Sequence, residues 1–251
     1  MSHSKPPSVA GSPARTLPPS LEVYLLGTVA LDAAVALMDW LAFDLSERSD
    51  GRGVLLLCEC PVAVSLGAEG SRRHLAAPAI DGEVPVVWQP RGGGAFVQGP
   101  GLLMVVPMIP LSQRKIPLGE VTPRLASALA SACESLKVPA RIGKTAPSSD
   151  GDAVYGRGGR LAAVGSAVRH GVTTYGGVLS VCPDPALPRM AVKEQWSSLA
   201  AQRAKPDLMH AARQAVLHAI AEVFSYERFH VHTSHEMLRR PKVLDRVMVS
   251  T

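Results

Sequence analysis

The chain has 251 residues, 47% of them hydrophobic, which is enough for one large domain or two small ones around a sizeable core. The formal net charge of +5 is a mild bias toward acidic partners, and only 4% of the residues are aromatic, so the composition argues against a nucleic-acid-binding protein. The sequence lacks a run of about 18 apolar residues and the apolar core of a signal peptide, so we expect a cytoplasmic monomer that does not bind membranes.

The first half of the chain alternates predicted strands with one long helix. Residues 1–20 are rich in Pro, Ser and Ala without periodicity, which predicts a disordered extension ahead of a single domain over 21–251. Apolar residues at helical spacing predict a helix over 31–46. Short β-branched and apolar runs predict strands at 21–26, 54–58, 62–66, 84–88 and 102–106.

The second half continues in the same manner. An amphipathic helix is expected over 122–136, with Pro123 in its first turn, and further helices over 194–203 and 206–224. The expected strands are 138–143, 152–155, 160–169, 172–175 and 178–181. Because Gly-rich turns join several neighbouring strands, we predict an α/β (α+β) fold with a mixed, mainly antiparallel sheet and packed helices.

The cysteines and histidines give little support for a metal site. Cys58, Cys60, Cys133 and Cys182 lack metal-ligand spacing, so we expect reduced thiols. His230 and His232 would share one face of a strand, but neither a Cys nor an acidic residue stands at a suitable spacing. We therefore predict that the protein holds no metal.

The stretch from Arg91 to Gly101 is the most distinctive part of the sequence. Six of its eleven residues are Gly or Pro, and apolar strands flank it. Such a stretch predicts either a backbone wall for a slender ligand or a hairpin loop with no ligand. Its spacing, Arg-Gly-Gly followed after five residues by Gly-Pro-Gly, resembles the signature of the octanoyltransferases in the biotin/lipoate protein ligase superfamily.

Three later blocks extend this resemblance to roughly residues 21–203. Residues 159–165 resemble the family's Lys-Ile-Ala-x-x-Gly strand, and residues 169–176 its Arg-Arg-Gly-Val-Thr-Tyr-His-Gly run. Residues 179–184 are similar to its Leu-Asn-Val-Asn-Pro-Asp sequence. The resemblance implies the catalytic-domain fold of this superfamily and an octanoyl or lipoyl substrate. No cofactor would be required, and ATP would be used only by a ligase.

The departures from the family pattern fall on its chemical residues. The family's lysine corresponds to Arg160, its two histidines to Gln98 and Tyr175, and its nucleophilic cysteine has no counterpart downstream of residue 193. Arg160 could still donate hydrogen bonds to an acyl carbonyl oxygen, although arginine is a poor proton carrier. Cys182 is then the candidate nucleophile, with a small buried cysteine as the alternative.

Two functions follow from the resemblance. The first is transfer or ligation of a lipoyl-type group onto a lysine of a carrier domain, with Arg160 and Cys182 as catalytic residues. The second is a non-catalytic module that binds a lipoylated or octanoylated carrier. The partner would be a lipoyl carrier domain, a glycine-cleavage-type carrier protein or an acyl carrier protein. The predicted substrate-binding residues are Arg91, Gly92, Gly93, Gly94, Gln98, Gly99, Gly101, Val164, Gly165, Tyr175 and Gly176, with Val97 and Leu102 as further lining.

Overall fold

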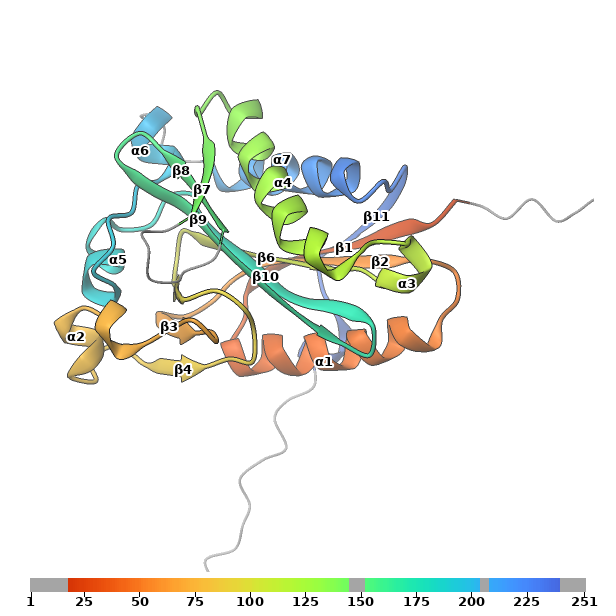
Figure 1. The fold of residues 1–251 in the computed structure, drawn as a ribbon, viewed down its shortest axis with the longest axis horizontal. Helices are drawn as coiled ribbons and strands as arrows, with labels where there is room; N and C mark the ends of the chain where they lie inside the picture. The colour runs from red at the N-terminus through yellow and green to blue at the C-terminus, as the bar shows by residue number, and fades with distance from the viewer. Residues whose placement is uncertain (1–17, 145–151, 204–207, 240–251) are drawn as a thin grey trace, which may run out of the picture.

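The computed structural model describes residues 18–144, 152–203 and 208–239 (Figure 1). The predicted extension therefore lies almost entirely outside the described residues, and the first strand begins at Ser20. Within the described part of the chain, no helix is long and apolar enough to cross a membrane.

An eight-stranded sheet runs through the molecule in the order β11-β1-β2-β6-β10-β9-β8-β7 (Figure 1). β1 pairs in parallel with both β11 and β2, and the remaining pairs are antiparallel. This confirms the predicted mixed, mainly antiparallel sheet. The strands are β1 (Ser20–Thr28), β2 (Gly53–Glu59), β6 (Leu102–Met108), β7 (Arg141–Lys144), β8 (Asp152–Gly156), β9 (Gly159–Arg169), β10 (Val172–Ser180) and β11 (Arg228–His232).

A second sheet of three strands, in the order β4-β3-β5, contains part of the Gly-rich stretch. Its strands are β3 (Ala63–Leu66), β4 (Val86–Trp88) and β5 (Ala95–Gln98). The sequence predicted a bend between the strands at 84–88 and 102–106, whereas the structure has a further strand there. β5 forms because its backbone pairs antiparallel with β3, and the glycines lie on either side of it.

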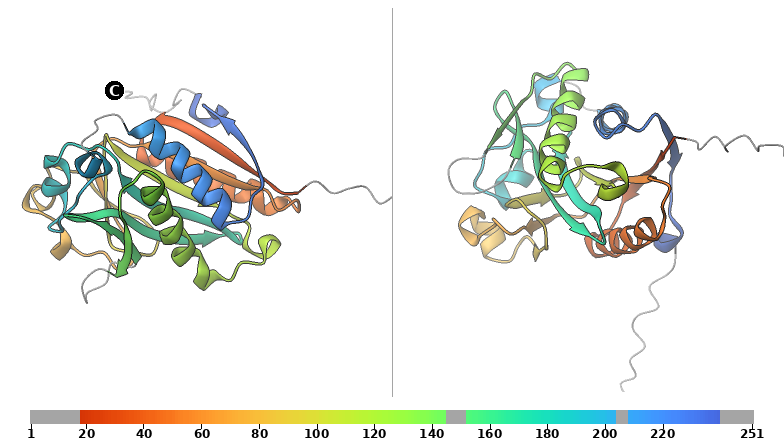
Figure 2. Two further views of the ribbon diagram at one scale, coloured as in Figure 1. Left: turned by 90° about the horizontal axis from the view of Figure 1, so that it is seen from above. Right: turned by 45° about the vertical axis from the view of Figure 1, so that its right-hand side comes forward.

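Helices cover both faces of the large sheet (Figures 1 and 2). α1 (Leu31–Glu47) lies against one face, and α4 (Val121–Ser135) and α7 (Met209–Val223) lie against the other. Alternate residues of β2 show the division, because Leu55 and Leu57 pack with α4 and α7 while Leu56 packs with α1. A strand buried on both faces needs apolar residues at nearly every position, which accounts for the continuous apolar run in β2.

The helices predicted at 31–46 and 122–136 are confirmed, and the one at 206–224 begins at Met209. The helix predicted over 194–203 is confirmed only in its second half, Leu199–Arg203 (α6). The residues before it are not helical, because the Arg160 N–H at the start of β9 donates to the Gln195 carbonyl and the Ser197 N–H donates to the Arg160 carbonyl. The other short helices are η1 (Arg72–His74), α2 (Ala77–Ile80), α3 (Leu111–Arg114), η2 (Leu118–Glu120), α5 (Ala186–Ala191) and α8 (Glu236–Arg239).

Candidate functional site

The side chain of Arg91 holds the Gly-rich loop, residues 91–94, in place, although Arg91 was predicted to bind substrate. Its side chain is buried, with 3% of the residue exposed. Nε donates to Gln89 Oε1 at 3.2 Å, and Nη1 donates to the carbonyls of Gly92 at 2.9 Å and Gly94 at 3.3 Å. Nη2 donates to the Ser65 carbonyl and to its hydroxyl, both at 2.8 Å. These five contacts match the five N–H groups of a guanidinium, so Arg91 holds the loop and β3 together.

Neutral hydrogen-bond acceptors and one aromatic ring surround the positive charge of Arg91. The guanidinium carbon lies 3.4 Å from the centre of the Phe96 ring, in a cation–π contact. Burial lowers the pKa of Arg91 to about 9, and the carboxylate of Glu69 acts in the opposite direction. The side chain therefore remains protonated at neutral pH.

Glycines allow the loop to touch the strands beside it. A Cβ atom added at Gly165 of β9 would lie 2.2 Å from the Gly92 carbonyl oxygen, and one added at Gly176 of β10 would lie 2.1 Å from the Val105 carbonyl oxygen. Gly93 also has a φ of +77°, which residues with a side chain rarely adopt. The backbone of the loop is thus in direct contact with β9, and β10 lies equally close to β6.

Gly165→Ala is expected to lower the free energy of unfolding by about 1–3 kcal/mol, the usual cost of overpacking a tightly packed site. Gly27→Ala is the matched control, because a Cβ atom there would have no neighbour within 4 Å. Urea denaturation of both variants measures the difference. Equal stability of the two variants would contradict the close packing of the loop against β9.

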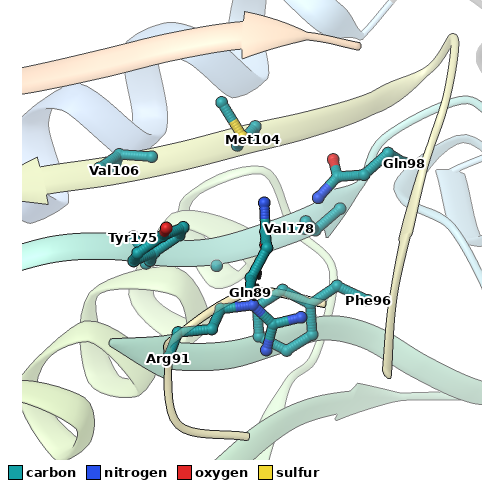
Figure 3. A pocket seen from close by; sticks show the side chains of 10 residues that line it. Gln89, Arg91, Phe96, Gln98, Met104, Val106, Tyr175 and Val178 are labelled. Atoms are coloured by element: carbon teal, nitrogen blue, oxygen red, sulfur yellow. Dashed lines mark hydrogen bonds between the residues drawn. The ribbon is translucent and has the colours of Figure 1, made fainter. Parts of the chain in front are cut away.

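A small pocket lies under this loop, and we call it the Tyr175 pocket (Figure 3). The loop, β5, β6 and β10 form its walls. Its cavity volume is about 10 Å³, room for a single water molecule, so a longer ligand can enter only if lining side chains move. The lining residues are Gln89, Arg91, Phe96, Gln98, Met104, Val106, Tyr175, Gly176, Gly177 and Val178.

Two buried polar side chains of the Tyr175 pocket lack hydrogen-bond partners among the described residues. Gln98 is 2% exposed and its Oε1 is unpartnered, and Tyr175 is 5% exposed with an unpartnered hydroxyl. Tyr175 also has a φ of 57°, a conformation that costs a non-glycine residue about 1–3 kcal/mol. Burial raises the pKa of Tyr175, so its phenol is neutral at pH 7. Unmet polar groups and a strained residue in one pocket make it the candidate ligand site.

Several predicted substrate-binding residues meet at this pocket. Arg91, Gln98, Tyr175 and Gly176 line it. Gly92 lies against Gly165, and its N–H donates to the Ser166 carbonyl at 2.9 Å. The Gly93 and Gly94 carbonyls accept the N–H groups of residues 69 and 67.

The other predicted binding residues lie outside the pocket lining. The Val164 side chain packs in the core beneath α4 and α7, and Val97 and Leu102 belong to a third buried cluster. Gly99 lies against Leu187. The Gly101 N–H donates to Glu59 Oε2 at 2.8 Å, so this glycine fixes a turn.

The two predicted catalytic residues are also absent from the pocket lining. Arg160 Nη2 lies 2.6 Å from Glu194 Oε2, and the Arg160 side chain is 2% exposed. Its guanidinium carbon lies 5.6 Å from the centre of the Trp196 ring. Cys182 is partly exposed, and its N–H donates to the Gly101 carbonyl at 3.0 Å. Their catalytic roles stay predictions.

Six lining residues were not identified from the sequence as site residues: Gln89, Phe96, Met104, Val106, Gly177 and Val178. The alternation of Met104 and Val106 along one strand indicates that they share a face. Periodicity does not indicate whether that face meets a ligand or a helix, so the sequence alone could not select them.

Two larger clefts lie elsewhere on the described residues. A cleft of about 490 Å³ is lined in part by Arg189, Lys193 and Glu194, and one of about 460 Å³ by Tyr24 and His235 among others. The Gly-rich stretch contributes to neither. Among the described residues, no three His, Cys, Asp or Glu side chains are placed to hold a metal ion, and Cys58, Cys60, Cys133 and Cys182 form no disulfide.

Comparisons with known proteins were made for both sequence and structure. The family model of the lipoyl protein ligase A/B catalytic domain matches residues 31–224. An octanoyltransferase from Thiobacillus denitrificans is 31% identical over 77% of this chain and 91% of that protein. One from Saccharophagus degradans is 31% identical over 57% of this chain and 64% of that protein. The chain thus spans less than two thirds of some of the curated relatives it matches.

The structural neighbours share this fold at low sequence identity. A putative lipoate protein ligase from T. acidophilum, solved with bound lipoic acid, has a TM-score of 0.67 at 14% identity, over 88% of this chain and 92% of that one. A lipoate-protein ligase A bound with ATP has a TM-score of 0.68 at 13% identity, over 88% and 91%. A bi-partite ligase from Thermoplasma acidophilum, described with its E2 lipoyl domain, has a TM-score of 0.63 at 15% identity, over 88% and 89%.

Proposed function

Because the chain belongs to the lipoyl protein ligase A/B catalytic-domain family, we propose that it acts in protein lipoylation by binding the octanoyl or lipoyl group of a carrier in the Tyr175 pocket. The observation that carries this proposal is the convergence of Gln98 and Tyr175, both buried with unpartnered polar atoms, beneath the Gly-rich loop. An acyl group bound there would meet both polar groups and an apolar wall.

Binding without an acyl-enzyme fits the chemistry of the pocket. Its ten lining residues include no Cys, Lys, His, Asp or Glu. A covalent acyl transfer needs a nucleophile and a group that moves protons near neutral pH, and Gln98 and Tyr175 do neither there. Arg160 is engaged by Glu194 at 2.6 Å, outside the lining.

The apolar residues of the pocket would bind an eight-carbon acyl chain with moderate affinity. Met104, Val106, Val178 and the Phe96 ring lie around the pocket (Figure 3). Burial of eight carbon groups stabilises a complex by about 0.8 kcal/mol each, roughly 6 kcal/mol before the costs of association and of opening the pocket. We therefore expect weak to moderate binding from the acyl chain alone, with the carrier domain adding the rest.

The second candidate is acyl transfer to a carrier-domain lysine, and the similarity to octanoyltransferases favours it. In this candidate Arg160 stabilises the carbonyl oxygen, and the partly exposed Cys182 thiol forms the acyl-enzyme. ATP would be required only if free lipoate were the donor. A lipoyl carrier domain would be the acceptor in this candidate.

Intact-mass measurement after mixing the protein with octanoyl-acyl carrier protein and an unmodified lipoyl domain separates the two candidates. The proposed function predicts that no acyl group appears on the protein or on the lipoyl domain. In a separate run the octanoyl carrier, here a lipoyl domain already octanoylated on its lysine, should co-elute with the protein. Octanoylation of the lipoyl domain would contradict it and support transfer.

Cys182→Ser refines that measurement. We expect this variant to bind the octanoyl carrier as the parent does, because Cys182 does not line the Tyr175 pocket. A covalent adduct on the parent that disappears in Cys182→Ser would identify the nucleophile of a transferase. Arg160→Ala should reduce transfer at least about a hundredfold if the second candidate holds.

A further inference from the structure

We infer that the Tyr175 pocket recognises its acyl group as a neutral amide, the form that the group has on a lysine side chain, in preference to a carboxylate or an ester. This inference rests on the proposed function and narrows its ligand. It concerns only the polar end of the bound group, where Gln98 Oε1 and the Tyr175 hydroxyl have no hydrogen-bond partner within the described part of the chain.

The pocket offers no free ionic donor to a carboxylate. All five N–H groups of Arg91 are used by Gln89, Gly92, Gly94 and Ser65. The face of its guanidinium is covered by the Phe96 ring. A carboxylate ligand would lose its hydration and gain no charge-assisted hydrogen bond from Arg91.

The remaining polar groups are neutral and include an acceptor. Tyr175 has a hydroxyl that can donate to a carbonyl oxygen, and the buried Gln98 Oε1 needs a donor. Gln89 accepts from Arg91 through Oε1, and Figure 3 shows its amide nitrogen directed away from that contact and into the pocket. Tyr175 and Gln89 therefore supply donors for a carbonyl oxygen, and Gln98 supplies an acceptor for one N–H group.

A secondary amide carries that combination of one C=O and one N–H. Its carbonyl oxygen accepts from Tyr175, and its N–H donates to Gln98. An ester or thioester has the carbonyl but no N–H, so Gln98 Oε1 would stay buried and unsatisfied.

The consequence concerns the stage of lipoylation at which the protein acts. An amide-linked acyl group is the product of attachment to lysine, whereas a thioester or free acid precedes attachment. A pocket with these preferences binds carriers that are already acylated.

The test compares three ligands of the same length: N-methyloctanamide, methyl octanoate and octanoate. Their dissociation constants for the full-length protein can be measured by ligand-observed NMR at a pH of about 7.5, roughly one unit above the ordinary pKa of histidine. We expect the amide to bind about tenfold or more tightly than the ester, and octanoate to bind more weakly still. Octanoate or ester binding as tight as that of the amide would overturn this inference and leave the proposed acyl pocket standing. Failure of all three to bind would overturn the proposed function as well.

Gln98→Leu and Tyr175→Phe identify the residues responsible. Gln98→Leu should abolish the preference for amide over ester, and Tyr175→Phe should weaken both, because it removes the donor to the carbonyl. Thr174→Val is the matched control: Thr174 also has a buried, unpartnered hydroxyl, but it does not line the pocket. The control should leave all three affinities unchanged. An amide preference that persists in Gln98→Leu would overturn the assignment.

The melting temperature of each variant separates a role in binding from a purely structural role. Removing an unpartnered buried polar atom relieves a desolvation penalty, so Gln98→Leu and Tyr175→Phe should melt no lower than the parent while binding changes. A variant that loses the amide preference and also melts well below the parent would point to a structural role and count against the inference.

Discussion

Arg91→Lys is expected to lower the free energy of unfolding by about 3–5 kcal/mol, as breaking a buried charged network does, and to remove binding to the Tyr175 pocket. Lysine has three donors on a point-like ammonium, so it cannot reach the Ser65, Gly92 and Gly94 acceptors together as the planar guanidinium does. At least two buried acceptors would be left without a donor. The Gly-rich loop would then lose its contacts with β3.

Urea denaturation and ligand-observed NMR measure the two effects of Arg91→Lys. Arg48→Lys is the matched control, because Arg48 is partly exposed and pairs with Asp44 within one helix turn at 2.8 Å. Exposed pairs of that kind contribute about 0–1 kcal/mol, so the control should be nearly neutral. A similarly small effect at Arg91 would show that the loop is held by its backbone alone.

Glu194→Ala is expected to cost about 3 kcal/mol of folding free energy, the lower end of the range for breaking a buried ion pair. The Arg160 side chain is 2% exposed, so its charge depends on the carboxylate at 2.6 Å, whereas Glu194 itself keeps 25% exposure. The variant also removes the acceptor of the Tyr155 hydroxyl. Residues 195–197, whose backbone bonds to Arg160 at the start of β9, should then loosen.

Thermal and urea unfolding of Glu194→Ala should be compared with Glu120→Ala. Glu120 also pairs with an arginine, Arg124 at 2.5 Å, but 49% of its side chain is exposed. We expect the control to lose less than about 1 kcal/mol. Equal losses of folding free energy in the two variants would show that burial of Arg160 does not increase the contribution of its ion pair to stability.

The large elements of the fold could be predicted from the sequence because they depend on local pattern. Helical spacing of apolar residues located α1 and α4, and apolar runs located β2 and β6. Elements that depend on a distant partner could not be predicted in this way. β5 exists because β3 pairs with it, and residues 195–197 are not helical because the Gln195 carbonyl and the Ser197 N–H bond to Arg160 of β9.

The candidate site was predictable in part. Resemblance to the family indicated Gln98 and Tyr175, and the structure brings both to one pocket. The role of Arg91 was not predictable, because a sequence does not show that its five donors are used by the neighbouring loop residues and by Ser65 of β3. The lack of partners for Gln98 Oε1 and the Tyr175 hydroxyl is likewise a property of packing.

Photocrosslinking tests the central claim, binding of an acyl group in the Tyr175 pocket, most directly. The probe is a lipoyl domain whose lysine carries an octanoyl analogue with a diazirine at the end of the chain. Irradiation followed by peptide mass spectrometry should place the label on β6 or β10, at residues such as Met104, Val106 or Val178. Labelling confined to the cleft at Arg189 and Lys193, or label on β6 and β10 that unattached N-methyloctanamide in excess does not suppress, would contradict the account.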